Sequence, residues 1–218
     1  MKKFLFFAIV LISINTYAQN TRIGFTTGVT IANYKSKVDG KTESATAKAG
    51  LTAGVLVDIP VAKHFSFQPA INFVQKGTKD EQSYGTLTQK GSININYLEM
   101  PLNFLYNSRS KAGNFFVGAG PSVAIAISGK AKYDDGTTKA SENLKFGTSD
   151  DSFMKPFDLG ANIMAGFALN NGVMFSLNYN AGLNNLFPHG TDDGSLRSNY
   201  FGIKLGYTLK GNKKHNNN

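Results

Sequence analysis

The residues of this chain that could carry chemistry include three histidines, His64, His189 and His215. They fall in a predicted turn, a predicted loop and the C-terminal tail. A hydrolase would need one of them to converge with a nucleophile and an orienting acid. None has a serine and a carboxylate at a suggestive strand spacing, so the sequence predicts no catalytic residue and we expect no enzyme.

Two aspartate pairs, in the segments DDG (134–136) and DDGS (192–195), could suggest calcium. The repeated oxygen ligands of an EF-hand loop are missing, however, and loop turns are the better interpretation. Cysteine is absent, which excludes a thiolate metal site. No Walker or Rossmann glycine pattern occurs in a strand-to-helix setting. We therefore expect neither a metal nor a cofactor.

The formal net charge is +9. The basic residues are scattered through turns, loops and the tail, whereas a nucleic-acid-binding protein would concentrate them on one element. The charge therefore indicates a solvated basic surface and no nucleic-acid partner.

The elements that would position any site are segments in which apolar and polar residues alternate. In segment 64–75, Phe65, Phe67, Ile71 and Phe73 share one parity. This is the period of a β-strand with one apolar and one polar face. Eight such segments occur, each close to the length that a tilted strand needs to cross a bilayer. They span 22–33, 51–59, 64–75, 92–106, 115–128, 157–169, 173–183 and 200–209.

Two features interrupt this pattern. In segment 92–106 the apolar parity changes from Ile95 and Tyr97 to Leu98 and Met100, which predicts a β-bulge at Tyr97–Leu98. Three prolines also fall within predicted strands, where each removes a hydrogen-bond donor. They are Pro69, Pro101 and Pro121.

The connections between the segments alternate in length. Short links join the second segment to the third, the fourth to the fifth and the sixth to the seventh, at 60–63, 107–113 and 170–172. The other links are long and polar, the longest at about 129–155. Outer-membrane barrels alternate short periplasmic turns with longer extracellular loops. The sequence therefore predicts an all-β fold, an eight-stranded antiparallel up-and-down transmembrane β-barrel.

The polar parity indicates which face points inward. A soluble sandwich or lipocalin-like barrel would bury the phenylalanines and carry many charges outside. Here the polar parity is mostly Gly, Ala, Ser, Thr, Asn and Gln, which suits the cramped lumen of an eight-stranded barrel. We expect the apolar parity to face lipid, with an aromatic girdle near the strand ends. Its predicted residues are Phe65, Phe67, Tyr97, Phe115, Phe157, Tyr179, Phe201 and Tyr207.

A few charged residues fall on the lumen parity, where an isolated charge would be costly. We expect them to pair in a structural polar network inside the barrel, with Arg22 and Asp58 near a hydrated rim. The predicted network contains Glu99, Asp158, Lys204, Asn162, Gln68, Asn72 and Asn178.

The N-terminus has the pattern of a secretory signal: two lysines, an apolar segment at 4–14 and TYA before Gln19. The alternative is a transmembrane anchor, but eleven apolar residues are too few to span the bilayer as a helix. The predicted organisation is a cleaved signal peptide at 1–18, a barrel domain at 19–209 and a polar periplasmic tail at 210–218.

Three strings add a resemblance to a known family. YLEMPL (97–102), FFVGAGP (115–121) and FDLGANIMAGF (157–167) make the chain resemble the outer-membrane β-barrel proteins of Bacteroidetes-type bacteria, the PorT-like or porin-family barrel domain. The resemblance implies a small integral barrel of the outer membrane. It also implies a C-terminal assembly signal in 200–207, although a polar tail follows here.

These observations predict a monomeric barrel of the Gram-negative outer membrane with a side-chain-filled lumen. Its expected role is structural, or the binding of external ligands by the long loops. A narrow solute pore and an accessory subunit of a secretion system are the alternatives. The expected partners are outer-membrane lipid, the barrel assembly machinery during biogenesis and, for the second alternative, an envelope or secretion-system protein.

Overall fold

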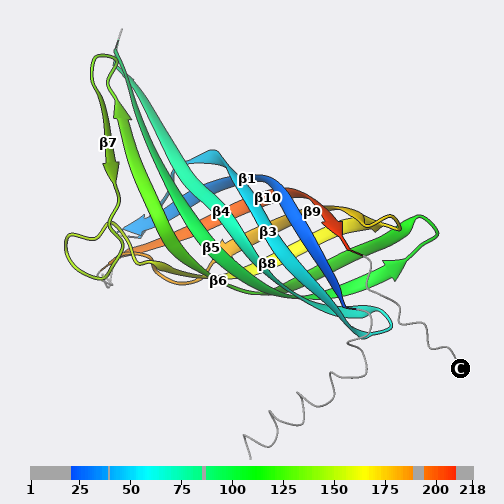
Figure 1. The fold of residues 1–218 in the computed structure, drawn as a ribbon. Coiled ribbons are helices and arrows are strands. Elements are labelled where there is room, and N and C mark those ends of the chain that lie inside the picture. The colour runs from blue at the N-terminus through cyan, green and yellow to red at the C-terminus, as the bar shows by residue number, and fades with distance from the viewer. Residues whose placement is uncertain (1–20, 39, 85–86, 189–193, 210–218) are drawn as a thin grey trace, which may run out of the picture.

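The computed structural model describes residues 21–38, 40–84, 87–188 and 194–209 (Figure 1). Among these residues, no helix is long and apolar enough to cross a membrane. The predicted signal peptide and tail, as well as His189, Asp192 and His215, lie outside the described residues. The strands are β1 (Arg22–Val38), β2 (Lys41–Ser44), β3 (Thr46–Ala62), β4 (Phe65–Tyr84), β5 (Leu87–Arg109), β6 (Gly113–Asp134), β7 (Lys139–Asn143), β8 (Phe157–Leu169), β9 (Val173–Gly182) and β10 (Gly194–Thr208).

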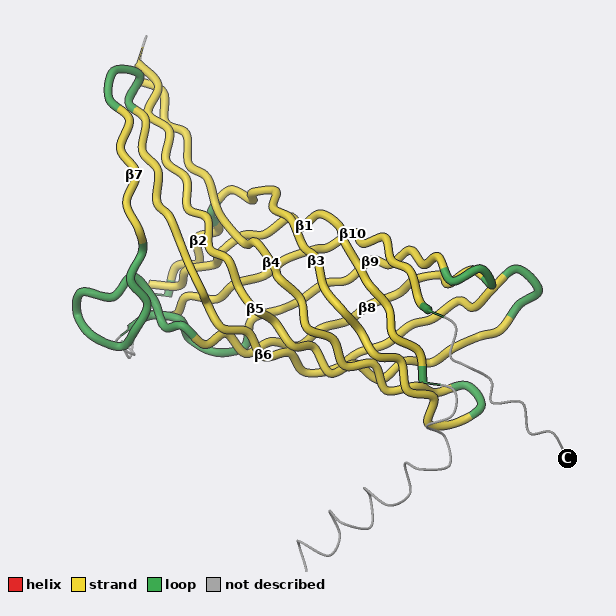
Figure 2. Tube along the Cα trace, in the orientation of Figure 1, coloured by secondary structure: helices red, strands yellow, loops and turns green. Residues whose placement is uncertain are grey.

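Eight of these strands close into one antiparallel ring, with the order β1-β3-β4-β5-β6-β8-β9-β10 (Figure 2). The last strand pairs back with the first, from Gly24↔Thr208 to Val38↔Gly194. Closure leaves no exposed sheet edge in the ring, as a membrane-spanning sheet requires. β2 and β7 are short additions that pair with β1 and β6. The predicted eight-stranded, up-and-down barrel is confirmed.

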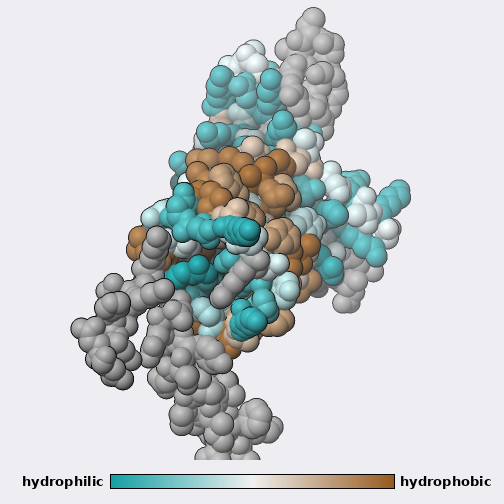
Figure 3. Space-filling view, turned by 90° about the vertical axis from the view of Figure 1, so that its right-hand side faces the viewer, coloured by the Kyte–Doolittle hydropathy of each residue, from teal (hydrophilic) through white to brown (hydrophobic). Residues whose placement is uncertain are grey.

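Apart from Ile95 and Tyr97 on β5, the apolar parity faces outward around the ring. Leu51 is 63% exposed and Ile71 57%, whereas Asn72, next to Ile71, is 2% exposed. Figure 3 shows the result as a large hydrophobic area at the surface, next to hydrophilic ends. A water-soluble protein rarely leaves so much contiguous apolar surface uncovered. Lipid is the environment that this surface fits.

Most of the predicted girdle residues lie on this outer face. Phe67 is half-buried because its ring packs 4.9 Å from that of Phe104. The residues that are more than one-third exposed are Phe65, Phe115, Phe157, Tyr179, Phe201 and Tyr207.

The prediction for Tyr97 is wrong, because this side chain is fully buried inside the barrel. The facing of β5 does not switch: Ile95, Tyr97 and Glu99 all point inward. The extra residue lies instead on the neighbouring strand β6, where the register shifts between the pairs Asn96↔Ser128 and Tyr97↔Ala126. The change of apolar parity in the sequence marks a change in what fills the lumen, not a change in strand facing.

The three strand prolines lie on the adjacent strands β4, β5 and β6. Pairing between β4 and β5 is interrupted between Pro69↔Leu102 and Asn72↔Glu99. Pairing between β5 and β6 is interrupted between Pro101↔Ser122 and Phe104↔Ala119. The positions without a backbone N–H group thus lie close together in one patch of the barrel wall. The pairing continues beyond this patch in the same register, without a bulge at Pro101.

The two ends of the barrel differ. The tight connections after β3, β5 and β8 lie at one end, which is the periplasmic end of an outer-membrane barrel. At the other end, β4, β5 and β6 are 20, 23 and 22 residues long and rise above the rest of the ring (Figure 1). These strands are longer than the predicted segments, because their polar ends continue the ladder that we had expected to be loop. We call this part the extracellular extension.

Candidate functional site

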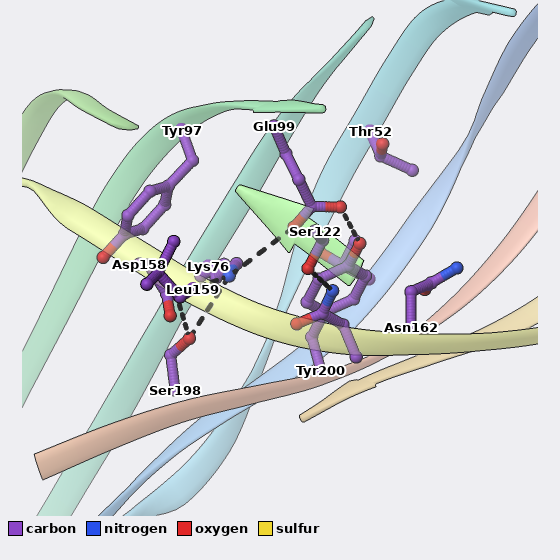
Figure 4. Close-up of polar contacts among 12 residues, drawn as sticks. Thr52, Lys76, Tyr97, Glu99, Ser122, Asp158, Leu159, Asn162, Ser198 and Tyr200 are labelled. Carbon is purple, nitrogen blue, oxygen red and sulfur yellow. Dashed lines mark hydrogen bonds and ion pairs between the residues drawn. The ribbon is translucent and has the colours of Figure 1, made fainter. Parts of the chain in front are cut away.

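The middle of the barrel holds a buried lysine between two buried carboxylates (Figure 4). The Lys76 ammonium lies 2.9 Å from Asp158 Oδ2 and 3.7 Å from Glu99 Oε2. It also donates a hydrogen bond to Ser198 Oγ at 3.2 Å. All three charged side chains are at most 2% exposed. One cation thus offsets two carboxylates in a space without bulk water.

Two tyrosines, Tyr97 and Tyr200, contact these charged groups. The Tyr200 hydroxyl donates a hydrogen bond to Glu99 Oε1. The Lys76 ammonium lies 4.7 Å from the centre of the Tyr97 ring and 5.0 Å from that of Tyr200. An ammonium at this distance from an aromatic face is attracted by its electron density. We call Lys76, Glu99, Asp158, Ser198 and Tyr200 the central cluster.

An asparagine ladder lies next to the central cluster. Asn162 Nδ2 donates to Asn103 Oδ1 at 2.9 Å, and Asn178 Nδ2 donates to Asn162 Oδ1 at 3.3 Å. The cavity left among these side chains has a volume of only about 30 Å³. The polar part of the lumen is therefore filled.

The structure brings the predicted network residues together on the inner wall. Glu99 and Asp158 belong to the central cluster, and Asn162 and Asn178 to the ladder. Gln68, Asn72 and Lys204 line the small cavity beside them. The ion pairs of the two carboxylates are made by Lys76, which our sequence analysis missed. The signal was present: Lys76 shares the parity of Gln68 and Asn72, but we had ended that segment at Gln75.

Apolar layers lie on both sides of the polar middle. Leu56, Leu105, Phe116 and Met174 form one cluster. On that side, at the rim, Arg22 Nη2 lies 2.6 Å from Asp58 Oδ2. The second cluster lies toward the extracellular end and contains Tyr34, Ile95, Tyr97, Ala124, Ala126, Met154 and Leu186.

The extracellular cluster closes the lumen from above. The hydroxyl groups of Tyr34 and Tyr97 lie 3.4 Å apart, and the Tyr97 hydroxyl lies 3.5 Å from Met154 Sδ. Met154 and Leu186 come from the connections after β7 and β9, so loop residues fold down into the barrel mouth. The phenol rings and these loop side chains form a floor.

A pocket of about 700 Å³ lies above that floor, inside the extracellular extension. Its floor contains Tyr34, Ile93, Met154 and Leu196. Its walls come from β2 to β7, three of whose residues are Glu43, Thr78 and Tyr133. We call this space the extracellular pocket. Its volume is in the range of pockets that hold small molecules.

The strand register separates the charges of the extension onto two faces. Asp80 and Glu142 share the inner face with Thr78, Ile93 and Ala131, because the pairs Thr78↔Ile93, Asp80↔Gly91 and Ala131↔Glu142 align them. Glu43 is opposite the inward-facing Ser36. The lysines of the same rows, Lys79 and Lys132, lie opposite Ser92 on the outer face. Atoms of Lys79 and Lys132 also border the pocket, so it has an apolar floor and walls with three carboxylates and two lysines.

The other residues singled out in the sequence lie apart from this pocket. His64 is in the β3–β4 turn, with Nδ1 3.1 Å from the Asn107 carbonyl oxygen. Asp135 Oδ1 accepts hydrogen bonds from the N–H groups of Thr137 and Thr138, so it stabilises a turn. Within the described ranges, no group of three acidic or histidine side chains could hold a metal ion.

A family model described as an outer membrane protein beta-barrel domain matches residues 17–188. The chain belongs to this family. The protein is accordingly a small barrel of the outer membrane, and its outward apolar surface faces lipid. The match ends before β10 (Gly194–Thr208), which closes the ring in the structure. The finer resemblance to PorT-like proteins stays a prediction.

Solved structures of other outer-membrane barrels are similar to this chain. OprG of Pseudomonas aeruginosa is 13% identical, with 88% of this chain and 96% of that chain covered and a TM-score of 0.44. Ail, the attachment invasion locus protein of Yersinia pestis, is 14% identical, with 88% and 99% covered and a TM-score of 0.40. Neisserial surface protein A is 10% identical, with 85% and 97% covered and a TM-score of 0.40. A search of curated proteins gave no match.

Proposed function

We propose that this outer-membrane barrel does not conduct solutes and binds a small, partly apolar organic cation in its extracellular pocket. The observation that carries the proposal is the pocket itself, which is open space of about 700 Å³ directly above a filled lumen. An eight-stranded barrel is just wide enough for its own side chains. A pore would need space through the middle, where the central cluster and the asparagine ladder lie.

The chemistry of the pocket supports a cationic ligand. Glu43, Asp80 and Glu142 contribute three carboxylates to its lining, against the two lysines Lys79 and Lys132, and Tyr34 and Tyr133 contribute aromatic rings. Carboxylates and aromatic faces both attract organic cations. The apolar floor would bury the rest of the ligand, as in other small-molecule sites.

The chain carries its own reporters for a test, because Met154 lies in the pocket floor and Met174 lies in the other apolar layer. Methyl NMR of the protein in lipid nanodiscs would follow both during titration with phenyltrimethylammonium. We expect the Met154 signal to shift and the Met174 signal to stay. The neutral analogue tert-butylbenzene and the anion benzenesulfonate should shift Met154 less.

A double variant, Glu43→Gln with Glu142→Gln, should weaken the binding of the cation at least about fivefold, because it removes two wall charges. A matched control is Asp150→Asn with Asp151→Asn, at exposed positions of the 144–156 connection, which should leave the affinity unchanged. If Met154 responds equally to the cation and the anion, or to neither, the proposed ligand class is wrong.

The proposal that the barrel does not conduct solutes has a separate test. In planar lipid bilayers, the purified protein should give no single-channel steps. Stable steps of one size would favour the narrow solute pore instead. Co-purification of specific envelope proteins after mild cross-linking would favour a secretion-system role, for which the resemblance to PorT-like proteins is the only support.

A further inference from the structure

We propose that the outer wall of the extracellular extension binds phosphate groups of outer-leaflet lipid through a band of basic side chains. The band contains Lys48, Lys79, Lys130 and Lys132. By strand register, Lys79, Lys130 and Lys132 lie on the face opposite to the extracellular pocket, although atoms of Lys79 and Lys132 also border it.

The register shows that the band continues the lipid-facing side. On β4, Ile71 and Phe73 are exposed to lipid, and Gln75, Gly77 and Lys79 follow on the same face. Lys79 pairs with Ser92, and Ser92 pairs with Lys132. Asn94 pairs with Gly77 and with Lys130 in the same way, one row closer to the lipid.

A row of polar side chains separates the band from the apolar surface. Gln75 Nε2 donates to Asn96 Oδ1 at 3.2 Å, and Asn96 Nδ2 donates to Ser128 Oγ at 2.9 Å. The outer face of these three neighbouring strands thus changes from apolar to amide and hydroxyl groups, and β4 and β6 then add ammonium groups. This is the order in which a membrane changes from hydrocarbon to headgroups.

The height of the band fits the headgroup layer. Lys130 follows Ile127, the last large apolar residue on this face of β6, by three residues. Three residues span about 10 Å along a strand, or about 7 Å of height at the usual barrel tilt. The polar layer on each side of a bilayer is about 5–8 Å thick. Lys79 and Lys132 lie one row higher, and their flexible stems can reach down toward the same phosphates.

The lysines of the band repel one another. The Lys48 stem crosses the outer face at Gly77, where a Cβ atom would come 3.2 Å from Lys48 Cδ. The Lys48 ammonium is close enough to those of Lys132 and Lys79 to be repelled by both. Lys79 and Lys132 flank the short side chain of Ser92, so their Cα atoms lie about 10 Å apart across three strands. An anion between them would remove this repulsion.

The band continues around the barrel. Lys35 on β1 lies directly opposite Arg197 on β10, both exposed and outward-facing. Like charges in opposite positions destabilise a sheet, so this pair also favours an anionic neighbour. Phosphate groups held in a plane at the membrane surface could meet all of these side chains, whereas one soluble anion could meet only some of them.

Native mass spectrometry of the detergent-solubilised protein tests the proposal, with diphosphoryl lipid A as the probe. Lys79→Gln, Lys130→Gln and Lys132→Gln together should weaken lipid A binding at least about tenfold. The charge-matched control Lys63→Gln, Lys111→Gln and Lys145→Gln changes exposed lysines outside the band and should bind as the unaltered protein does. Dephosphorylated lipid A should bind weakly to all three proteins.

Three results would overturn the proposal: equal weakening in both triple variants, equal binding of the dephosphorylated lipid, or tight binding of inorganic phosphate without lipid. The last result would indicate a site for a soluble anion. If the band variant fails to fold, the unaltered protein still provides a test, because its affinity for lipid A should fall steeply as salt is raised. An affinity that does not change with salt would contradict a phosphate contact.

Discussion

Lys76 and Lys79 lie three residues apart on the same strand, in surroundings that differ completely. Lys76 points into the barrel, is 1% exposed, and contacts two buried carboxylates. Lys79 points outward in the extracellular extension and is exposed. The comparison teaches that charged side chains of one strand have two roles. In the middle of the barrel they form ion pairs that fill the lumen, and in the extension they are available to bind external partners. Changes in the middle should alter stability, and changes in the extension should alter binding.

The largest expected effect comes from Lys76→Ala. It leaves Asp158 and Glu99 buried without their cation, which should cost about 3–5 kcal/mol of unfolding free energy. Urea unfolding of the protein in lipid vesicles would measure it. Lys79→Ala is the matched control on the same strand and should stay within about 0.5 kcal/mol. Equal effects would remove the distinction between the two regions.

The second effect concerns the lipid-facing wall. Leu177→Arg or Val123→Arg should each cost about 2–4 kcal/mol if the side chain lies near mid-bilayer. Leu177 is 48% and Val123 38% exposed on the outer face. Ser141→Arg, on the exposed strand β7, should be nearly neutral in the same unfolding experiment. Near-neutral results at Leu177 and Val123 would contradict their contact with hydrocarbon.

A smaller effect is expected at the boundary between the two regions. Tyr97→Phe keeps the ring beside Lys76 but removes the hydroxyl that contacts Tyr34 and Met154. The loss should be about 0.5–1.5 kcal/mol, as for other single hydrogen bonds. Tyr106→Phe, at an exposed outer position, is the control. A result at Tyr97 no larger than at Tyr106 would mean that the floor of the pocket does not depend on this contact.

The smallest effect is a local dependence on pH. Hydrogen bonds from the backbone N–H of Thr138 and from Thr137 lower the pKa of Asp135 below its usual value. The turn is therefore stabilised above the usual pKa of about 3.9. This stabilisation is lost as the pH falls through the lower, folded value. Amide exchange at 135–138 should accelerate in that acid range, and in Asp135→Ala it should already be fast at neutral pH. An unchanged exchange rate in the variant would show that the turn does not need the carboxylate.

The barrel fold could be predicted from the sequence because the patterns that indicate it appear among residues close together in the chain. The period of two, as in segment 64–75, and the alternation of short and long links require only neighbouring residues to be compared. The facing of Ile71 and Phe73 followed from the small, neutral residues between them. The family match supports the same fold.

The contents of the lumen could not be predicted equally well. The inward side chain of Tyr97 packs against Tyr34, from β1, and Met154, from the connection after β7, which both lie far from it in the sequence. Lys76 could have been found by following the parity of β4 beyond Gln75. The two faces of the extension depend on pairing such as Lys79↔Ser92↔Lys132, which no single segment reveals.

The most direct test of the account is to ask what surrounds alternate side chains of one strand. The chain has no cysteine, so single cysteines at positions 175–180 of β9 can each carry a spin label in lipid vesicles. Electron paramagnetic resonance should show that spin labels in place of Phe175, Leu177 and Tyr179 collide with oxygen dissolved in the lipid. Labels in place of Ser176, Asn178 and Asn180 should collide little with either oxygen or aqueous nickel. Nickel contact at the first three positions, or oxygen contact without a period of two, would contradict a lipid-facing wall around a filled lumen.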